Sequence, residues 1–198
     1  MLIDRLKEKD IILASGSPRR KLLLKEMGIS FRVETRSVKE NFPEGLNPRE
    51  VAVFLSRLKS NAFKNDELIP DKLLITADTV VASGNTILGK PTDENDAFNM
   101  LKILSGKSHD VITGITLRTA QKESSFFAST TVYFSNLSDE LISYYITHYK
   151  PYDKAGAYGI QEWIGHVAIE KIEGSYFNVM GLPTHKLYTE LISFTKKE

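Results

Sequence analysis

Residues 11–28 read IILASGSPRRKLLLKEMG and contain the strongest local signal in the chain. The apolar start is typical of a short buried strand. A small polar turn, Ser15–Ser17, leads to Pro18, which suits the first position of a helix with Ser17 as its N-cap. The leucines that follow give this helix an apolar side, and Gly28 ends it. A strand that turns directly into a helix is typical of an α/β fold.

The rest of the chain alternates helix and strand signals before its strands cluster. Asn47 caps a helix that has Pro48 at its first position and Glu50 at its third. The remaining signals predict strands at 73–81, 109–118 and 125–134, a hairpin turn at 83–85, an edge strand at 166–174, and helices at 92–106, 138–149 and 181–194. This order predicts a single α/β domain, residues 1–198, whose central sheet is mixed and flanked by helices.

Composition excludes several kinds of site. The 198 residues include no cysteine, so the chain has no disulfide scaffold, thiol nucleophile or Cys-based metal site. The four histidines lack the H-x-x-x-H and H-E-x-x-H spacings of zinc sites, and the G-x-S-x-G motif of serine hydrolases is missing. With 26 basic and 25 acidic residues, the net charge of +1 argues against nucleic acid or a membrane surface as partner.

Location can also be predicted from the sequence. The N-terminal residues MLIDRLKEKD are too charged for a signal peptide. No apolar stretch approaches the roughly 20 residues that a bilayer-spanning helix needs. We therefore expect a cytoplasmic protein that does not enter the membrane.

The turn after the first strand is a candidate anion site. A helix N-terminus has unpaired N–H groups and a partial positive charge, so it attracts anions. Ser15 and Ser17 add hydroxyl donors, and Arg19 and Arg20 add guanidinium groups that suit phosphate. The alternative is an ordinary capped helix with two solvated arginines.

A carboxylate, Asp78, lies inside the apolar run LLITADTVV at 73–81. In such a run it has to be paired, bound to a metal or shifted in pKa. It is therefore either a general base or metal ligand at the end of a sheet strand, or a strand-end aspartate bonded to a loop. Four further charged residues are each, taken alone, more typical of a solvated surface: Glu40, Lys59, Lys90 and Lys154.

Together these segments resemble the Maf family of nucleoside triphosphate pyrophosphatases, in order and over nearly the whole chain. The matching segments are ASGSPRRKLL at 14–23, LSRLK at 55–59, ADTVV at 77–81, GKP at 89–91, HDV at 109–111, DKAGAYGIQ at 153–161 and NVMGLP at 178–183. The block at 153–161 resembles the branch that acts on dTTP and UTP. Two departures are Lys39, where the family has the Asp of an Asp-Glu pair, and Glu162, where it usually has Gly.

The resemblance implies an elongated α/β structure with a deep nucleotide-binding cleft, a fold shared with inosine-triphosphate pyrophosphatases. The implied reaction is hydrolysis of a nucleoside triphosphate, most of all dTTP or UTP, to the monophosphate and pyrophosphate. The resemblance implies that this activity removes unwanted nucleotides from the pool, with cell-division arrest as a further role that the family suggests. The implied cofactor is Mg²⁺ or Mn²⁺, the implied partner is a small-molecule nucleoside triphosphate, and related proteins often form homodimers.

The resemblance also gives a role to each candidate residue. Asp78 is the catalytic proton acceptor. The substrate-specificity residues are Arg19, Thr79 and Gln161. The phosphate-binding residues are Ser15, Ser17, Arg20, Lys59 and Lys90. The metal ligands are Glu40 and Asp78.

Two alternatives remain at this stage. One keeps the reaction but changes the base to 7-methylguanine or a non-standard purine, and the block at 153–161 argues against the 7-methyl-GTP branch. The other is a non-catalytic nucleotide-binding regulator of cell division. The presence of Asp78 and the lysines argues against an inactive protein.

Overall fold

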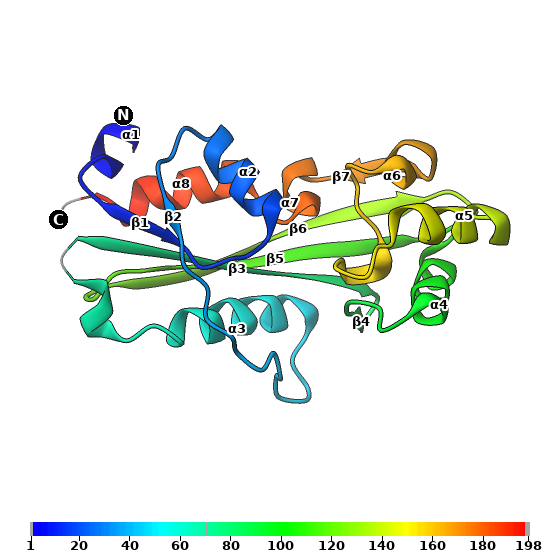
Figure 1. Ribbon diagram of the computed structural model, residues 1–198, viewed down its shortest axis with the longest axis horizontal. Coiled ribbons are helices and arrows are strands. Elements are labelled where there is room, and N and C mark those ends of the chain that lie inside the picture. The colour runs from blue at the N-terminus through cyan, green and yellow to red at the C-terminus, as the bar shows by residue number, and fades with distance from the viewer. Residues whose placement is uncertain (1, 70, 197–198) are drawn as a thin grey trace.

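The computed structural model describes residues 2–69 and 71–196. Its centre is a seven-stranded sheet in the order β2-β1-β3-β5-β6-β7, with β4 beside β3 (Figure 1). The strands are β1 Asp10–Leu13, β2 Arg32–Val33, β3 Lys72–Ser83, β4 Thr86–Leu88, β5 Ser108–Arg118, β6 Glu123–Phe134 and β7 Ile169–Glu173. β1 runs parallel to β2 and β3, and the other pairs are antiparallel. The predicted mixed sheet is confirmed.

Helices cover both faces of this sheet and one of its ends. In Figure 1 the helices α2 and α8 lie on one face, α3 lies on the other, and α4, α5 and α6 gather at the end far from the two termini. The helices are α1 Leu2–Leu6, α2 Pro18–Glu26, α3 Pro48–Asn61, α4 Glu94–Leu104, α5 Asp139–Tyr149, α6 Trp163–Val167, α7 Tyr176–Met180 and α8 Thr184–Phe194, with 3₁₀ turns η1 Asn65–Leu68 and η2 Ala155–Ala157. Within the described ranges, no helix is both long and apolar enough to cross a bilayer.

Helices α2 and α3 each begin directly after a residue whose side chain caps the helix N-terminus. The Ser17 hydroxyl accepts a hydrogen bond from the Arg20 amide at the start of α2. At α3 the Asn47 side chain accepts from the Glu50 amide, and the Glu50 carboxylate accepts from the Asn47 amide at 2.8 Å, so the predicted capping box is present. These caps explain why both helix starts could be located from sequence.

Helix α3 is held against the sheet by a close approach at Gly114 in β5. A Cβ on Gly114 would overlap the backbone of Ala52, so glycine is required for this contact. Beside it, the Ser56 hydroxyl lies 2.9 Å from the Thr116 hydroxyl, and the Thr76 hydroxyl donates to the Ser56 carbonyl at 2.7 Å. These buried bonds fix the height of α3 over β3 and β5, and with it the position of Lys59 in the last turn of α3.

Strand β3 has one open stretch of edge. β1 pairs with it as far as Ile75, and β4 pairs with it only from Val81 onward. Residues 76–80 of β3 therefore pair with neither β1 nor β4 along this edge. Asp78 lies here, opposite Gly114 of β5, in the middle of the strand and not at its end. The expectation of a strand-end carboxylate was wrong because β3 continues beyond the apolar run, to Ser83.

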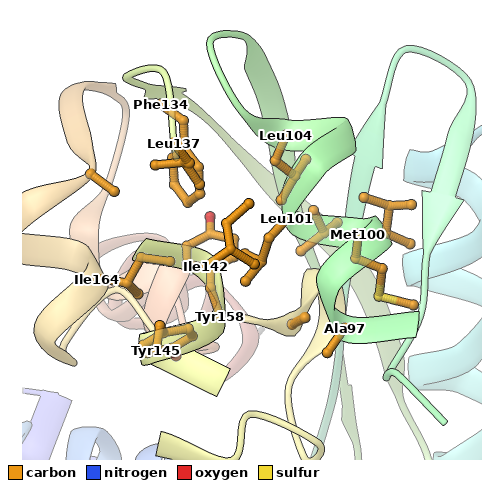
Figure 2. Packing of buried hydrophobic residues seen from close by; sticks show 14 of the residues in the cluster. Ala97, Met100, Leu101, Leu104, Phe134, Leu137, Ile142, Tyr145, Tyr158 and Ile164 are labelled. Atoms are coloured by element: carbon orange, nitrogen blue, oxygen red, sulfur yellow. The ribbon is translucent and has the colours of Figure 1, made fainter. Parts of the chain in front are cut away.

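The end of the sheet far from the termini has its own apolar core. Figure 2 shows how side chains of α4 and α5 meet residues that follow β6 and η2. The predicted apolar side of α4 is buried there, together with Tyr145 and Tyr158. Tyr158 therefore anchors the segment after η2 to a packed core.

Replacing Gly114 by alanine tests the contact between α3 and β5. We expect Gly114→Ala to lower the free energy of unfolding by about 3 kcal/mol, because an added methyl group meets backbone that cannot move aside cheaply. Ser124→Ala on β6, half-buried and opposite Leu117, on the other face of the sheet from Thr116, should change it by less than about 0.5 kcal/mol. Urea unfolding of both variants measures the difference, and equal stability of the two would contradict the proposed close approach.

Candidate functional site

The predicted site residues gather around one cavity. A cavity of about 400 Å³ is lined by Ser17, Arg19, Arg20, Glu40, Lys59, Asp78, Thr79, Lys90 and Gln161, among others. An adjoining hollow of about 390 Å³ shares Ser17, Arg19, Arg20, Glu40, Lys59 and Lys90 with it and adds Ser15. Ser15 in the hollow and Gln161 in the cavity, 146 positions apart in the sequence, therefore line two spaces that share several residues.

The open edge of β3 forms the floor of this cavity. Side chains alternate along a strand, so Asp78 and Thr79 leave β3 on opposite faces. Asp78 meets Lys59 of α3, whereas Thr79 meets Arg20 of α2. The cavity thus reaches both faces of the sheet at the place where β1 has ended and β4 has not begun.

Arg20 joins the walls of the cavity. Its Nε donates to the Gly181 carbonyl at 2.8 Å. One terminal nitrogen donates to the Ala77 carbonyl at 2.8 Å and to the Ser15 hydroxyl at 3.2 Å, and the other donates to the Thr79 hydroxyl at 3.0 Å. Burial lowers the pKa of the Arg20 guanidinium from its ordinary value, while the nearby Asp78 charge acts in the opposite direction.

These bonds change the expected role of Arg20. A guanidinium has five N–H donors, and the four bonds above leave one on the second terminal nitrogen. Arg20 is therefore first a framework residue that orients Ser15 and Thr79. Only its remaining donor and its charge are left for a bound anion.

Lys59 brings two carboxylates together. Its ammonium group pairs with Glu40 Oε1 at 2.8 Å and with Asp78 Oδ1. Burial opposes ionisation of Glu40, but the hydrogen bond from Lys59 and the charges of Lys59, Lys90 and Arg20 outweigh it and hold the pKa of Glu40 below its usual value. Glu40 is therefore ionised at neutral pH.

The cavity offers two carboxylates, Glu40 and Asp78, as oxygen ligands for a divalent cation. Across residues 2–69 and 71–196, the side chains form no cluster of three or more His, Asp or Glu that could hold a metal by themselves. Mg²⁺ is commonly bound by one or two carboxylates together with substrate phosphates. Glu40 and Asp78, brought together at Lys59, fit such a cation when phosphate oxygens supply the remaining ligands.

Gln161 lies on the other side of the cavity, in the segment after η2. Among the described residues, its Oε1 atom is buried and has no hydrogen-bond partner. Nearby, Tyr158 lines the cavity, and its hydroxyl lies 2.7 Å from Nε2 of the buried His109. Burial lowers the pKa of His109 to about 4, so the ring is neutral at pH 7. The groups beside Gln161 are therefore neutral and polar, in contrast to the charged groups around Lys59.

Arg19 is tied to the same segment through Asp153. Its guanidinium lies 3.1 Å from Asp153 Oδ2, and Asp153 Oδ1 lies 2.6 Å from the Lys154 ammonium group. Lys154, which alone looked like a surface charge, is buried and also pairs with Glu162 at 3.0 Å. Lys90 is exposed, at the border of the cavity and the adjoining hollow.

Sequence reasoning missed several residues of this wall. Asp153, Tyr158 and Met180 line the cavity, although only Lys154 and Gln161 were singled out from the block at 153–161 and Met180 lies outside that block. The available signal was the block itself, in which a charged pair precedes a Gly/Ala-rich stretch. What the pattern does not contain is the distant partner of each residue, such as Arg19 for Asp153.

Known proteins match this chain over nearly its full length. A protein of Cytophaga hutchinsonii named dTTP/UTP pyrophosphatase is 51% identical over 191 residues, which is 96% of this chain and 87% of that protein. A protein of Phocaeicola vulgatus with the same name is 51% identical, covering 96% of this chain and 98% of its own length. One of Porphyromonas gingivalis, also of that name, is 48% identical over 98% of both chains.

Solved structures give a partial overlap. The structure of a HAM1 protein from Coxiella burnetii covers 65% of this chain and 74% of its own, with 17% identity and a TM-score of 0.43.

The match to a family extends across the whole sheet and the cavity. The profile described as Maf-like protein matches residues 10–194, from the first residue of β1 to the last residue of α8. It therefore includes every residue that lines the cavity and the adjoining hollow. The sequence resemblance is confirmed, and the chain belongs to the family of Maf-like proteins.

Proposed function

We propose that the protein hydrolyses dTTP and UTP to the corresponding monophosphate and pyrophosphate. The observation that carries this proposal is the two-sided cavity. One wall concentrates cations and carboxylates around Lys59, and the other includes Gln161, whose buried Oε1 has no hydrogen-bond partner among the described residues. The names of relatives that are about half identical to this chain support the same reaction and the same bases.

The base is assigned to the Gln161 wall. Uracil and thymine present an N3–H donor between two carbonyl acceptors, whereas cytosine has an acceptor at N3. An unpartnered carbonyl oxygen such as Gln161 Oε1 needs a donor, which N3–H supplies. A polar site of this kind discriminates strongly, because the wrong base leaves a buried group unpaired.

The triphosphate is assigned to the charged wall and the adjoining hollow. Ser15 and Ser17 lie at the N-terminus of α2, where hydroxyls and unpaired amides favour an anion. The cations there are Arg19, the remaining donor of Arg20, Lys59 and Lys90. Glu40 and Asp78 would hold Mg²⁺ or Mn²⁺, which neutralises phosphate charge when it is bound.

Asp78 is assigned as the proton acceptor. A water molecule attacks the α-phosphorus and gives a proton to the Asp78 carboxylate, while the bond from that phosphorus to the bridging oxygen breaks and pyrophosphate leaves. Lys59 orients Asp78 through their ion pair, and the buried contacts of α3 hold Lys59 in place. In this kind of reaction most of the catalysis comes from positioning and charge neutralisation.

A panel of nucleotides tests the proposal. In the presence of Mg²⁺, we expect dTTP and UTP to release pyrophosphate and the monophosphate, and CTP to be hydrolysed much more slowly. The panel also includes 7-methyl-GTP and ITP, with pyrophosphate and orthophosphate measured separately. Faster hydrolysis of a purine nucleotide would contradict the assignment of uracil and thymine as the preferred bases. Release of orthophosphate alone would rule out attack at the α-phosphorus. No turnover of any nucleotide would favour a nucleotide-binding protein without activity.

Removing the Asp78 carboxylate tests its role as the proton acceptor in catalysis. General-base catalysis contributes typically 10²–10⁴-fold, so Asp78→Asn should lower kcat by at least about 100-fold. Thermal unfolding should still show a folded protein. Asp66→Asn, which changes an exposed carboxylate on η1, is the matched control and should keep full activity. Near-normal turnover by Asp78→Asn would remove Asp78 from the reaction.

Metal dependence is tested at Glu40. Chelation should abolish pyrophosphate release, and added Mg²⁺ or Mn²⁺ should restore it. In Glu40→Gln the Mg²⁺ concentration for half-maximal rate should rise by about 10-fold, because one of two protein ligands is lost. The control is Glu44→Gln, an exposed position in the same loop. If Glu40→Gln and the wild-type protein respond alike to Mg²⁺, Glu40 is not a ligand.

A further inference from the structure

Glu162 directly follows Gln161 and makes two polar contacts. Its Oε1 atom pairs with the Lys154 ammonium group at 3.0 Å, and its Oε2 atom accepts a hydrogen bond from the Tyr145 hydroxyl. Tyr145 is fully buried in the core at the far end of the sheet, where Figure 2 shows it beside Ile164. The two carboxylate oxygens of Glu162 thus connect the loop that carries Gln161 to Lys154 and to the buried Tyr145.

The partner of Glu162 is a buried cation. The Lys154 side chain is 9% exposed, and a buried ammonium group without a counter-charge is costly. It has two carboxylate partners, but the Asp153 side chain is 58% exposed whereas that of Glu162 is 20% exposed. Solvent screens the first pair more than the second. Glu162 is therefore the main compensation for Lys154.

Three side chains pack together over Gly159. A Cβ on Gly159 would lie 2.9 Å from Glu162 Cδ, 3.0 Å from Gln161 Nε2 and 3.0 Å from Lys154 Cε. The Gly159 amide also donates to the Tyr145 hydroxyl at 3.1 Å. The Gln161 amide thus has its place beside the Glu162–Lys154 pair, and a shift of that pair moves Gln161.

The same pair extends to the charged wall. Lys154 contacts Asp153, and Asp153 contacts Arg19 on α2. A continuous series of polar contacts therefore runs from Tyr145 through Glu162, Lys154 and Asp153 to Arg19. It joins the wall assigned to the base with the wall assigned to the phosphates.

We propose that Glu162 is a positioning residue for base selection. Its carboxylate holds Lys154 and Tyr145 in place, and these in turn fix Gln161 against the base and Arg19 against the phosphates. The inference rests on the proposed function, since it takes Gln161 as the residue that contacts the base. It concerns Glu162, which acts through its neighbours and does not itself touch the substrate.

The experiment compares Glu162→Gln with the wild-type protein on UTP and CTP. Loss of the charge should raise KM for UTP by about 10-fold and lower the UTP/CTP ratio of kcat/KM by a similar factor, the usual effect of one misplaced hydrogen bond. The value of kcat for UTP should stay within about 3-fold, because Asp78 and Lys59 are untouched. Dissociation constants of UMP and CMP, measured by calorimetry, report the same change without turnover.

Two further variants test whether Glu162 acts through its neighbours. Tyr145→Phe removes the donor to Glu162 without changing a charge and should reduce the UTP/CTP ratio in the same direction, by about 3-fold. If Glu162→Gln does not fold, the UTP/CTP ratio of Tyr145→Phe alone tests whether Glu162 is a positioning residue. The double variant Lys154→Met with Glu162→Gln should lose no more selectivity than Glu162→Gln alone, because members of one network are not additive.

Glu170→Gln, an exposed carboxylate on β7, is the matched control and should behave as the wild-type protein does. An unchanged UTP/CTP ratio in folded Glu162→Gln and Tyr145→Phe would overturn the inference. A fall in kcat that is equal for UTP and CTP would also overturn it, since it would indicate a general loss of structure. Failure of the proposed function is separate and visible beforehand, as a wild-type protein that neither hydrolyses UTP nor binds UMP.

Discussion

The buried guanidinium of Arg20 is the interaction on which the site depends. β1 stops pairing with β3 at Ile75, and the next carbonyl facing that side belongs to Ala77. Arg20 donates to this carbonyl, so a side chain takes over where the strand has ended. A buried carbonyl without a partner would cost about 1–3 kcal/mol, which explains why this position needs a long donor. The remaining bonds of Arg20 then attach Ser15, Thr79 and Gly181 to the same point.

The cationic side chains around the cavity are paired with carboxylates. Lys59 faces Glu40 and Asp78, Lys154 faces Asp153 and Glu162, and Arg19 faces Asp153. Lys59 and Arg19 are paired with carboxylates at least 19 residues away in sequence, whereas Lys154 is paired with carboxylates of its own segment, so positive and negative charges are nearly balanced around the cavity. The arrangement holds a set of cations close together without the mutual repulsion that unpaired charges would cause.

Sequence predicted the elements that local chemistry determines. The caps at Ser17 and Asn47 and the apolar side of α4 are short-range features, and each lies where it was expected. The five-residue helices α1, α6 and α7 and the two-residue strand β2 were not predicted, since they are too short for a periodic pattern. Most candidate residues were recognised through motifs, yet their partners were not. Whether Arg20 is solvated or buried depends on Ala77 and Gly181, which are distant in sequence.

Asp78 and Thr79 are consecutive residues that serve different faces of one strand. Because strand geometry separates them, the wall around Lys59 and the wall around Gln161 are built from different elements, α3 on one side and the segments around α7 and η2 on the other. Substitutions in the second set that keep the contact between Asp153 and Arg19 can therefore accumulate without disturbing the ion pairs of Lys59. Such a division lets a lineage change the base that it accepts while it keeps one way of cleaving phosphates, provided that Arg20 continues to hold the two halves together.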